Sequence, residues 1–244
     1  CILAKMADWA RADALAHLGT RTVRLTIGSR LAAFGVIADR AAAAAPDSPD
    51  LPVVRDWLAD RVGAQMRFWE TAPDRASQNN LRGWAALAGA SVAGLVDDPV
   101  MRGWAAWSLA YVVCSAAPDG SLPQEMRRGP RALHYQLHAL AALVPAAALL
   151  RQQGIDLTDR CDGALARAVR FALADLAEGT ATEAITGETQ TMHDGSDPLE
   201  PFQLAFLEAW LTIEADPAVE EVVQALRPLS YSKLGGNQTL IWSR

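Results

Sequence analysis

A basic segment that leads into aromatic and imidazole side chains is the part of this sequence best suited to chemistry. Arg127, Arg128 and Arg131 come just before a predicted helix whose first turns carry His134 and Tyr135. Guanidinium groups match carboxylates, and Arg128 and Arg131 can point at one anion. A phenol close to them can give and take a proton. The segment therefore predicts a carboxylate-binding site with a proton-transfer tyrosine. The alternative is a solvated basic turn with a packed tyrosine.

The spacing of two histidines raises the question of a metal. His134 and His138 lie four residues apart, the spacing by which one helix face presents two imidazoles to an ion. No glutamate stands between them in the pattern of a metallopeptidase. We therefore expect one histidine to line a cleft and the other to be a hydrogen-bonded core or surface residue. The sequence also lacks a glycine-rich phosphate loop, so we predict no metal and no cofactor.

A second polar segment lies upstream, where Asn79 and Asn80 precede an apolar helix. Adjacent amides at this position can cap the helix or present an NH₂ group to a ligand, and capping is the commoner use. Trp84 follows one helical turn after Asn80. It could stack on a sugar ring, although tryptophan at helical spacing is more often part of the core. We predict that Trp84 lines the cleft because it is close to Asn80.

Helices must position these side chains, because the chain shows almost no strand signal. Apolar residues recur at helical spacing, and turn clusters separate the runs. The predicted helices span residues 2–18, 20–46, 51–71, 80–96, 98–116, 129–153, 158–178, 201–215 and 217–227. The polar segment 179–200 predicts a long surface loop, and residues 239–242 predict a short strand or extended tail.

The character of these helices indicates the fold class. Several are rich in alanine and apolar over most of their circumference, which is typical of helices buried on more than one side. Others, such as 51–71, carry many charges and fit an outer layer. Alternating inner and outer helices with short links predict an all-α fold, an incomplete (α/α) toroid of antiparallel helical hairpins.

The start of the chain suggests missing residues. The sequence opens at Cys1 inside a helical pattern, without an initiator methionine. We expect a single domain over residues 1–244 that lacks N-terminal residues. A mature lipoprotein acylated at Cys1 is the alternative.

Composition excludes several classes of protein. Hydrophobic residues make up 51% of the chain and charged residues 20%, unlike a disordered chain. The net charge of −6 argues against general nucleic-acid binding. No apolar run approaches the roughly 20 residues that span a membrane. Cys1, Cys114 and Cys161 are far apart, which disfavours a disulfide scaffold or a zinc ribbon and leaves open one disulfide with one free thiol.

The two polar segments together resemble the alginate lyases of polysaccharide lyase family 5. The run from Asn79 to Ala86 is similar to that family's Asn-Asn-His-Ser-Tyr-Trp-Ala-Ala motif. The run from Asp119 to Tyr135 is similar to its Asp-Gly-Phe-Leu-Pro-Asn-Glu segment with the basic cluster and Arg-Ala-Leu-x-Tyr that follow. The ending from Lys233 to Leu240 looks like the family's tail. The resemblance covers about residues 70–244.

The resemblance implies a metal-independent β-elimination on a uronate-containing polymer of the mannuronan, alginate or glucuronan type. Asn80 and Arg128 would neutralise the substrate carboxylate, and Tyr135 would act as base, acid or both. His134 is the further catalytic candidate. Side chains expected to bind substrate are Arg131, Arg127, Trp84 and His138. The partner would be an acidic polysaccharide or oligosaccharide. The resemblance also implies a periplasmic or secreted protein, and we expect a monomer.

One departure from the family motif bears on the chemistry. Leu81 occupies the place of the family's active-site histidine, and leucine carries neither a proton nor a hydrogen bond to a carboxylate. His134 or His138 could supply the lost function. Tyr135 could carry out both proton transfers where C5–H and C4–O lie on the same side, as in β-D-mannuronate and β-D-glucuronate. The third possibility is lost or changed activity, and we favour a changed substrate.

Two rival functions follow from these residues. A non-catalytic polyuronate-binding protein would explain Leu81. A helical-toroid glycoside hydrolase would need two carboxylates beside the scissile bond. Asp119 and Glu125 are candidates for such carboxylates, but nothing in the sequence pairs them.

Overall fold

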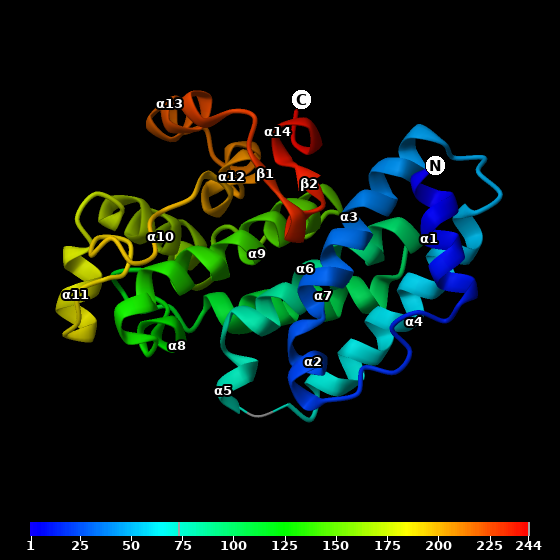
Figure 1. Ribbon diagram of the computed structural model, residues 1–244, viewed down its shortest axis with the longest axis horizontal. Helices are drawn as coiled ribbons and strands as arrows, with labels where there is room; N and C mark the ends of the chain where they lie inside the picture. The colour runs from blue at the N-terminus through cyan, green and yellow to red at the C-terminus, as the bar shows by residue number, and fades with distance from the viewer. Residues whose placement is uncertain (73, 244) are drawn as a thin grey trace.

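The structure is a computed structural model that describes residues 1–72 and 74–243. Figure 1 shows helices along most of the chain. The strands of the described residues form one two-stranded sheet near the C-terminus. The α-helices are α1 Ile2–Arg11, α2 Arg21–Thr26, α3 Gly28–Ala44, α4 Leu51–Trp69, α5 Asp74–Ser77, α6 Asn80–Val96, α7 Pro99–Val113, α8 Pro123–Met126, α9 Ala132–Gln152, α10 Arg160–Asp175, α11 Thr180–Thr186, α12 Leu207–Ile213, α13 Pro217–Leu226 and α14 Gln238–Ile241. The 3₁₀ turns are η1 Gly129–Arg131, η2 Pro201–Leu204 and η3 Ser232–Leu234, and the strands are β1 Ser230–Tyr231 and β2 Gly236–Asn237.

Helix α6 is the central element of the molecule. It is buried around almost its whole circumference and packs against α3, α4, α7 and α9. The contact with α3 is close because Gly28 lies against the backbone of α6, where an added Cβ would stand 2.8 Å from the nitrogen of Ala85. Helices α6 and α7 form an antiparallel hairpin (Figure 1). Asp97 in the left-handed conformation ends α6, and Asp98 caps α7.

Helix α9 is the second inner helix and carries the basic segment at its start. Its residues from Ala139 to Leu150 are all buried, including Pro145. The helical stretch Gly129–Gln152 is long and apolar enough to cross a membrane, judged by length and composition alone. The sequence analysis expected no run of this kind. However, 83% of its most apolar window is buried inside the fold, so its apolar side chains contact neighbouring helices.

Most of the predicted long helices are confirmed, and the differences have local causes. The helix predicted over 2–18 ends at Arg11 because Asp13 and Leu15 adopt positive φ angles. The helix predicted over 20–46 is divided between α2 and α3.

Two predictions about the C-terminal third are wrong in detail. The surface loop predicted over 179–200 contains α11, whose first backbone N–H groups donate to the buried carboxylate of Asp175. The extended tail predicted over 239–242 is a helical turn, α14, capped by Asn237. The strand pairing lies earlier, between β1 and β2.

A disulfide joins Cys114, which follows α7, to Cys161, which lies in the left-handed residues at the start of α10. Cys1 is free and exposed. The sequence left the pairing open, because cysteines that are 47 residues apart give no local signal. The bond ties the α6–α7 hairpin to the segment that follows α9.

Candidate active site

The site forms where the first turns of α6 and α9 meet. Asn80 and Trp84 lie one turn apart on α6, and Tyr135 and His138 lie three residues apart on α9. Residues at these spacings share one face of a helix. The packed helices therefore bring together four of the side chains that the sequence singled out.

Asn80 is anchored by a buried carboxylate. Its backbone N–H donates to Glu125 Oε1 at 2.7 Å, and its side-chain Nδ2 donates to Glu125 Oε2 at 3.0 Å. Asn80 and Glu125 are 2% and 1% exposed. Burial raises the pKa of Glu125, while the two hydrogen bonds and Arg128 oppose that shift. The neighbouring Asn79 is the helix cap and accepts from Leu81 N at 2.9 Å.

Arg128 links this buried pair to Tyr135. Its Nε lies 3.9 Å from Glu125 Oε2, and its guanidinium carbon lies 4.6 Å from the centre of the Tyr135 ring. The guanidinium is partly exposed, so it can still reach a ligand. A cation over an aromatic face is attracted to the ring and holds its orientation.

His138 is held in place by a hydrogen bond from Trp84. Trp84 Nε1 donates to His138 Nε2 at 3.1 Å. Burial, followed by the charges of Lys233 and His134, lowers the pKa of His138 to about 3. The imidazole is therefore neutral at physiological pH. Its ring meets that of Tyr135 edge-on, with 6.2 Å between the centroids.

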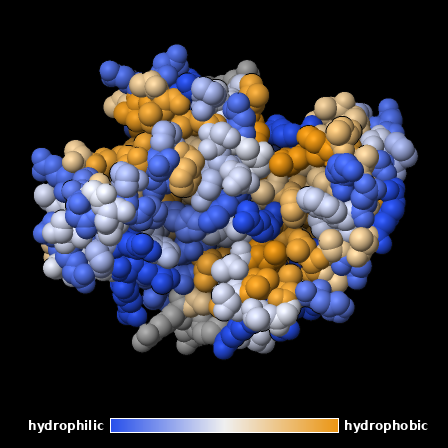
Figure 2. Space-filling view, in the orientation of Figure 1, coloured by the Kyte–Doolittle hydropathy of each residue, from blue (hydrophilic) through white to orange (hydrophobic). Residues whose placement is uncertain are grey.

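Of these side chains, Tyr135 and His138 line a pocket of about 260 Å³. Figure 2 shows this face hollowed between the side that carries α8 and α11 and the side that carries α1 to α4, with hydrophilic residues in the hollow. The pocket is lined by Arg131, His134, Tyr135, Leu137, His138, Ala141, Asp197, Phe202, Gln203, Tyr231 and Lys233.

His134 and Arg131 share an acidic neighbour at the pocket rim. Asp197 Oδ2 lies 3.7 Å from His134 Nδ1 and 3.9 Å from Arg131 Nε. Gln203 Nε2 also lies 3.2 Å from His134 Nδ1. Burial lowers the pKa of His134, an effect that Asp197 opposes and Arg131 reinforces. Arg131 itself is 61% exposed and free to turn toward a ligand.

The pocket residues from the C-terminal segments were not among the predicted site residues; they are Asp197, Phe202, Gln203, Tyr231 and Lys233. Phe202 and Tyr231 are in ring contact at 4.9 Å, and Lys233 Nζ lies 5.9 Å from the rings of both Trp84 and Tyr231. Burial lowers the pKa of Lys233 and raises that of Tyr231 to about 12. Lys233 forms no ion pair with any residue of the described chain, so its charge is available to an anionic ligand.

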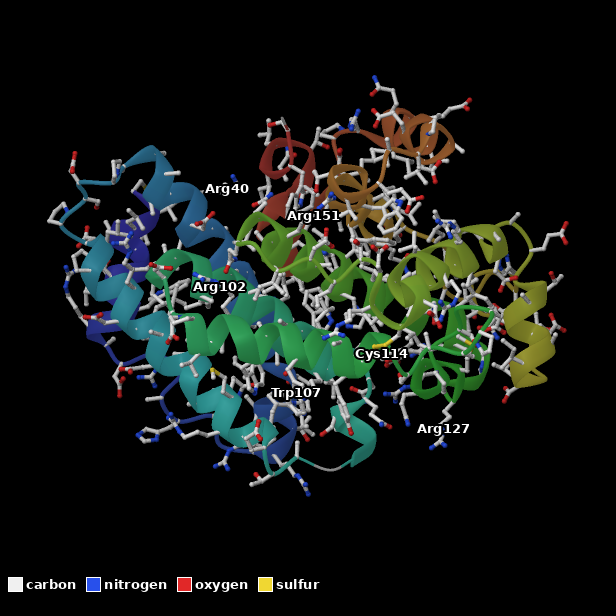
Figure 3. All side chains as sticks on the ribbon, turned by 180° about the vertical axis from the view of Figure 1, so that it is seen from behind. Arg40, Arg102, Trp107, Cys114, Arg127 and Arg151 are labelled. Carbon is white, nitrogen blue, oxygen red and sulfur yellow. A yellow bond between two sulfur atoms is a disulfide. The ribbon has the colours of Figure 1, made fainter. Side chains whose placement is uncertain are left out.

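Other predicted side chains lie in different surroundings. Trp84 is 2% exposed, so its ring is not open to a sugar, and the predicted stacking role is replaced by its hydrogen bond to His138. Arg127 is exposed and projects outward from the turn after α8 (Figure 3), away from the pocket lining. Arg131 lines the pocket, whereas Arg128 lies over the ring of Tyr135 and is not among the lining residues.

No group of three metal-ligating side chains occurs in the described parts of the chain. His134 and His138 line the same pocket, yet each has other partners: Gln203 and Asp197 for His134, and Trp84 for His138. Glu125, the anchor of Asn80, appeared in the sequence only as a possible hydrolase acid. Its position two residues after a proline that begins a short helix gave no sign of its burial.

Similar proteins agree with this fold. The family model described as alginate lyase matches residues 19–182. An alginate lyase of Pseudomonas aeruginosa is 30% identical over 255 residues, which cover 100% of this chain and 67% of that protein. One from Pseudomonas syringae pv. tomato is 28% identical, covering 99% of this chain and 65% of that protein. The chain thus spans about two thirds of the length of these relatives.

Solved structures give the same result for the fold. Alginate lyase A1-III from Sphingomonas species A1 superposes with a TM-score of 0.81 at 21% identity, covering 100% of this chain and 69% of that one. A histidine-to-alanine variant of A1-III in complex with a tetrasaccharide gives a TM-score of 0.83, at 21% identity and with the same coverage. The predicted incomplete (α/α) toroid is therefore confirmed.

The fold and its pocket define a helical-toroid protein of the polysaccharide lyase class. The chain belongs to the alginate lyase family.

Proposed function

We propose that this protein is a polysaccharide lyase that cleaves alginate or a related polyuronate by β-elimination. The main support is the position of Tyr135. Its ring lines the pocket and contacts both the Arg128 guanidinium and the neutral His138. Family membership supports the reaction class, and the surplus of basic groups around the pocket supports an anionic polymer as the substrate.

Removal of the proton at C5 of a uronate requires neutralisation of its carboxylate. Lys233, which forms no ion pair within the described chain, lines this pocket. The partly exposed Arg128 lies over the ring of Tyr135, and Asn80 is held by Glu125. Fixed donors aimed at the carboxylate stabilise the enolate that develops when the proton leaves. We assign this role to Arg128 and to the second N–H of the Asn80 amide, the one that Glu125 does not accept.

Tyr135 then moves the protons. As phenolate it takes the C5 proton. The electrons of the C5–H bond form the C4=C5 double bond while the C4–O bond breaks, and the leaving oxygen takes the proton back from Tyr135. One side chain suffices when C5–H and C4–O lie on the same side, as in β-D-mannuronate and β-D-glucuronate. Leu81 stands where the family has its active-site histidine, so this second candidate for proton transfer is missing. Its absence favours mannuronate and glucuronate over guluronate as substrates.

We further propose that the reaction needs no metal and that the protein acts in the periplasm or outside the cell. The first point rests on the pocket's protein-borne cations, which can perform the neutralisation that a metal would otherwise supply. The second rests on the family and is compatible with the disulfide between Cys114 and Cys161, since such bonds persist in oxidising compartments.

A hydrolase finds less support. That reaction needs two carboxyl groups on either side of the glycosidic bond. Among the residues that line the pocket, Asp197 is the one carboxylate, and it contacts Arg131 and His134. Glu125 is buried and accepts two hydrogen bonds from Asn80.

The test is the Tyr135→Phe variant, assayed for unsaturated product with polymannuronate. We expect loss of turnover with an unchanged melting temperature, because only one partly exposed hydroxyl is removed. Tyr111→Phe is the matched control: Tyr111 lies on α7, outside the pocket lining, and its change should leave the rate unaltered. A Tyr135→Phe enzyme as active as the wild type would refute the assignment.

A further inference from the structure

The two histidines of the pocket differ in how they are held. His134 is approached at the rim by Gln203 and Asp197, and more than a quarter of its side chain is exposed. His138 lies deeper, between Trp84 and Tyr135, with ring centroids 5.2 and 6.2 Å away. His138 is therefore the more deeply held of the two, and its hydrogen bond to Trp84 orients its ring without a ligand.

The contact with Trp84 determines the protonation state of His138. An indole N–H can only donate, so the imidazole nitrogen that faces it must offer a lone pair. That nitrogen is Nε2, at 3.1 Å from Trp84 Nε1. A neutral imidazole with an unprotonated Nε2 carries its proton on Nδ1. Trp84 thus makes His138 an N–H donor through Nδ1.

The groups that face His138 oppose a second proton on the ring. Lys233 from η3 is its cationic neighbour, a charge on His134 from the same helix would also disfavour that proton, and Tyr231 packs against Trp84 from β1. Asp197, the acid of the pocket, contacts Arg131 and His134 instead. Consistent with this arrangement, the pKa of His138 is lowered to about 3.

We infer that His138 is the neutral hydrogen-bond donor of the active site and that Trp84 is the positioning residue that fixes its tautomer. The Nδ1–H group donates to the substrate carboxylate, and this bond strengthens as the carboxylate becomes the enolate. No proton leaves His138 during the cycle, since Tyr135 carries both transfers. The inference rests on the proposed lyase function, and it gives His138 the role that Leu81 cannot perform.

Nitrogen NMR of histidine-labelled protein tests the tautomer without requiring turnover. We expect His138 to show a protonated Nδ1 and an unprotonated Nε2 from pH 5 to 8, with no titration. In Trp84→Phe, which keeps an aromatic ring but removes the donor, the tautomers should mix. A protonated Nε2 in the wild type, or titration of His138 near pH 6.5, would overturn the inference.

Kinetics test the donor role. His138→Leu should lower kcat about tenfold or more, as is typical for loss of one donor to a developing anion, with a smaller change in KM. His138→Gln, which can still donate an N–H, should recover part of the loss. His17→Gln is the control: His17 lies outside the pocket lining.

The outcomes separate this inference from the proposed function. A His138→Leu enzyme within twofold of the wild-type kcat would refute the donor role while leaving the lyase assignment intact. If wild-type protein produced no unsaturated product from any polyuronate, the lyase function would fail, and the donor role would fail with it. The tautomer fixed by Trp84 would still be testable by NMR. If His138→Leu does not fold, Trp84→Phe provides the same comparison, with loss of kcat expected alongside the mixed tautomers.

Discussion

Asn80 and Glu125 form a polar pair that is almost completely buried, and its geometry leaves little room for substitution. Both carboxylate oxygens of Glu125 accept from Asn80, one from the backbone N–H and one from the side chain. Buried polar groups that lose a partner cost free energy because water cannot replace it. The pair therefore fixes the first turn of α6 at the point where the site begins.

We predict that Glu125→Gln loses most of its activity while it remains folded. Glutamine offers one oxygen and one NH₂, so an NH₂ group would face a donor of Asn80 in either orientation. We expect a loss of about 1–3 kcal/mol in the free energy of unfolding by urea titration at pH 7. Glu178→Gln, at an exposed position, is the matched control. Full activity in Glu125→Gln would show that the Asn80 orientation is irrelevant to turnover.

The buried neutral imidazole of His138 predicts a specific loss of stability in acid. Its pKa in the folded protein, about 3, lies below the ordinary value of 6.5. Between these values the unfolded chain binds more protons than the folded one, so stability rises with pH and is lost as pH falls from about 6.5 toward 3. The burial of His134 acts in the same direction. His138→Gln should therefore show a smaller drop in melting temperature between pH 7 and pH 4.5. An identical drop would contradict the burial of an uncharged His138.

At this scale the sequence predicted residue types better than their roles. Asn80, Arg128, Tyr135 and His138 could be singled out because their motifs and spacing are local. The burial of Trp84 could not, since an α-helix with alanine on every side gives no indication of which face is covered. Glu125 was missed as an anchor because its partner is 45 residues away.

Among the elements, the junction of α7 and α10 is held by a covalent bond. The disulfide between Cys114 and Cys161 closes a loop of 47 residues that includes all of α9, with its catalytic candidates. Closing a loop of this length in the unfolded chain corresponds to roughly 4 kcal/mol of stabilisation in the chain-entropy model.

We predict that replacing both cysteines with serine lowers the free energy of unfolding by about 2–4 kcal/mol. Both positions are exposed, so serine leaves no buried hydroxyl. The measurement is denaturant unfolding without reductant, with Cys1→Ser as the control because Cys1 is free. Wild-type protein with added reductant should behave like the double variant. Equal stability of all forms would contradict a structural role for the bond.

Element boundaries followed the local signals where these were strong. The predicted helices 80–96 and 98–116 agree with α6 and α7 to within a few residues, and Asn79 and Asp98 cap them. The end of α1 was missed because Asp13 and Leu15 adopt a backbone conformation that their residue types do not favour. The turn α14 was missed because four residues are too few to show a helical period.

Across the whole molecule, the site is assembled from segments far apart in the chain. The first turns of α6 and α9 supply the predicted residues, and the C-terminal segments supply Phe202, Tyr231 and Lys233. The fold class could be predicted from the apolar helices. The sequence could not predict that residues more than 60 positions after Tyr135 line the same pocket, because local patterns carry no information on such distant contacts. The basic pocket is also opposite in sign to the net charge of −6, so overall charge does not describe the site.

The most direct test of the central claim is the ultraviolet absorbance of the protein incubated separately with polymannuronate, polyguluronate and polyglucuronate. A β-elimination at C5 creates a C4=C5 double bond that absorbs, whereas hydrolysis creates none. We predict a rise in absorbance with polymannuronate or polyglucuronate, and a slower rise or none with polyguluronate, because Tyr135 alone serves substrates whose C5–H and C4–O share one side. A flat trace with all three polymers would contradict the lyase assignment. A rise with polyguluronate alone would contradict the single-tyrosine mechanism.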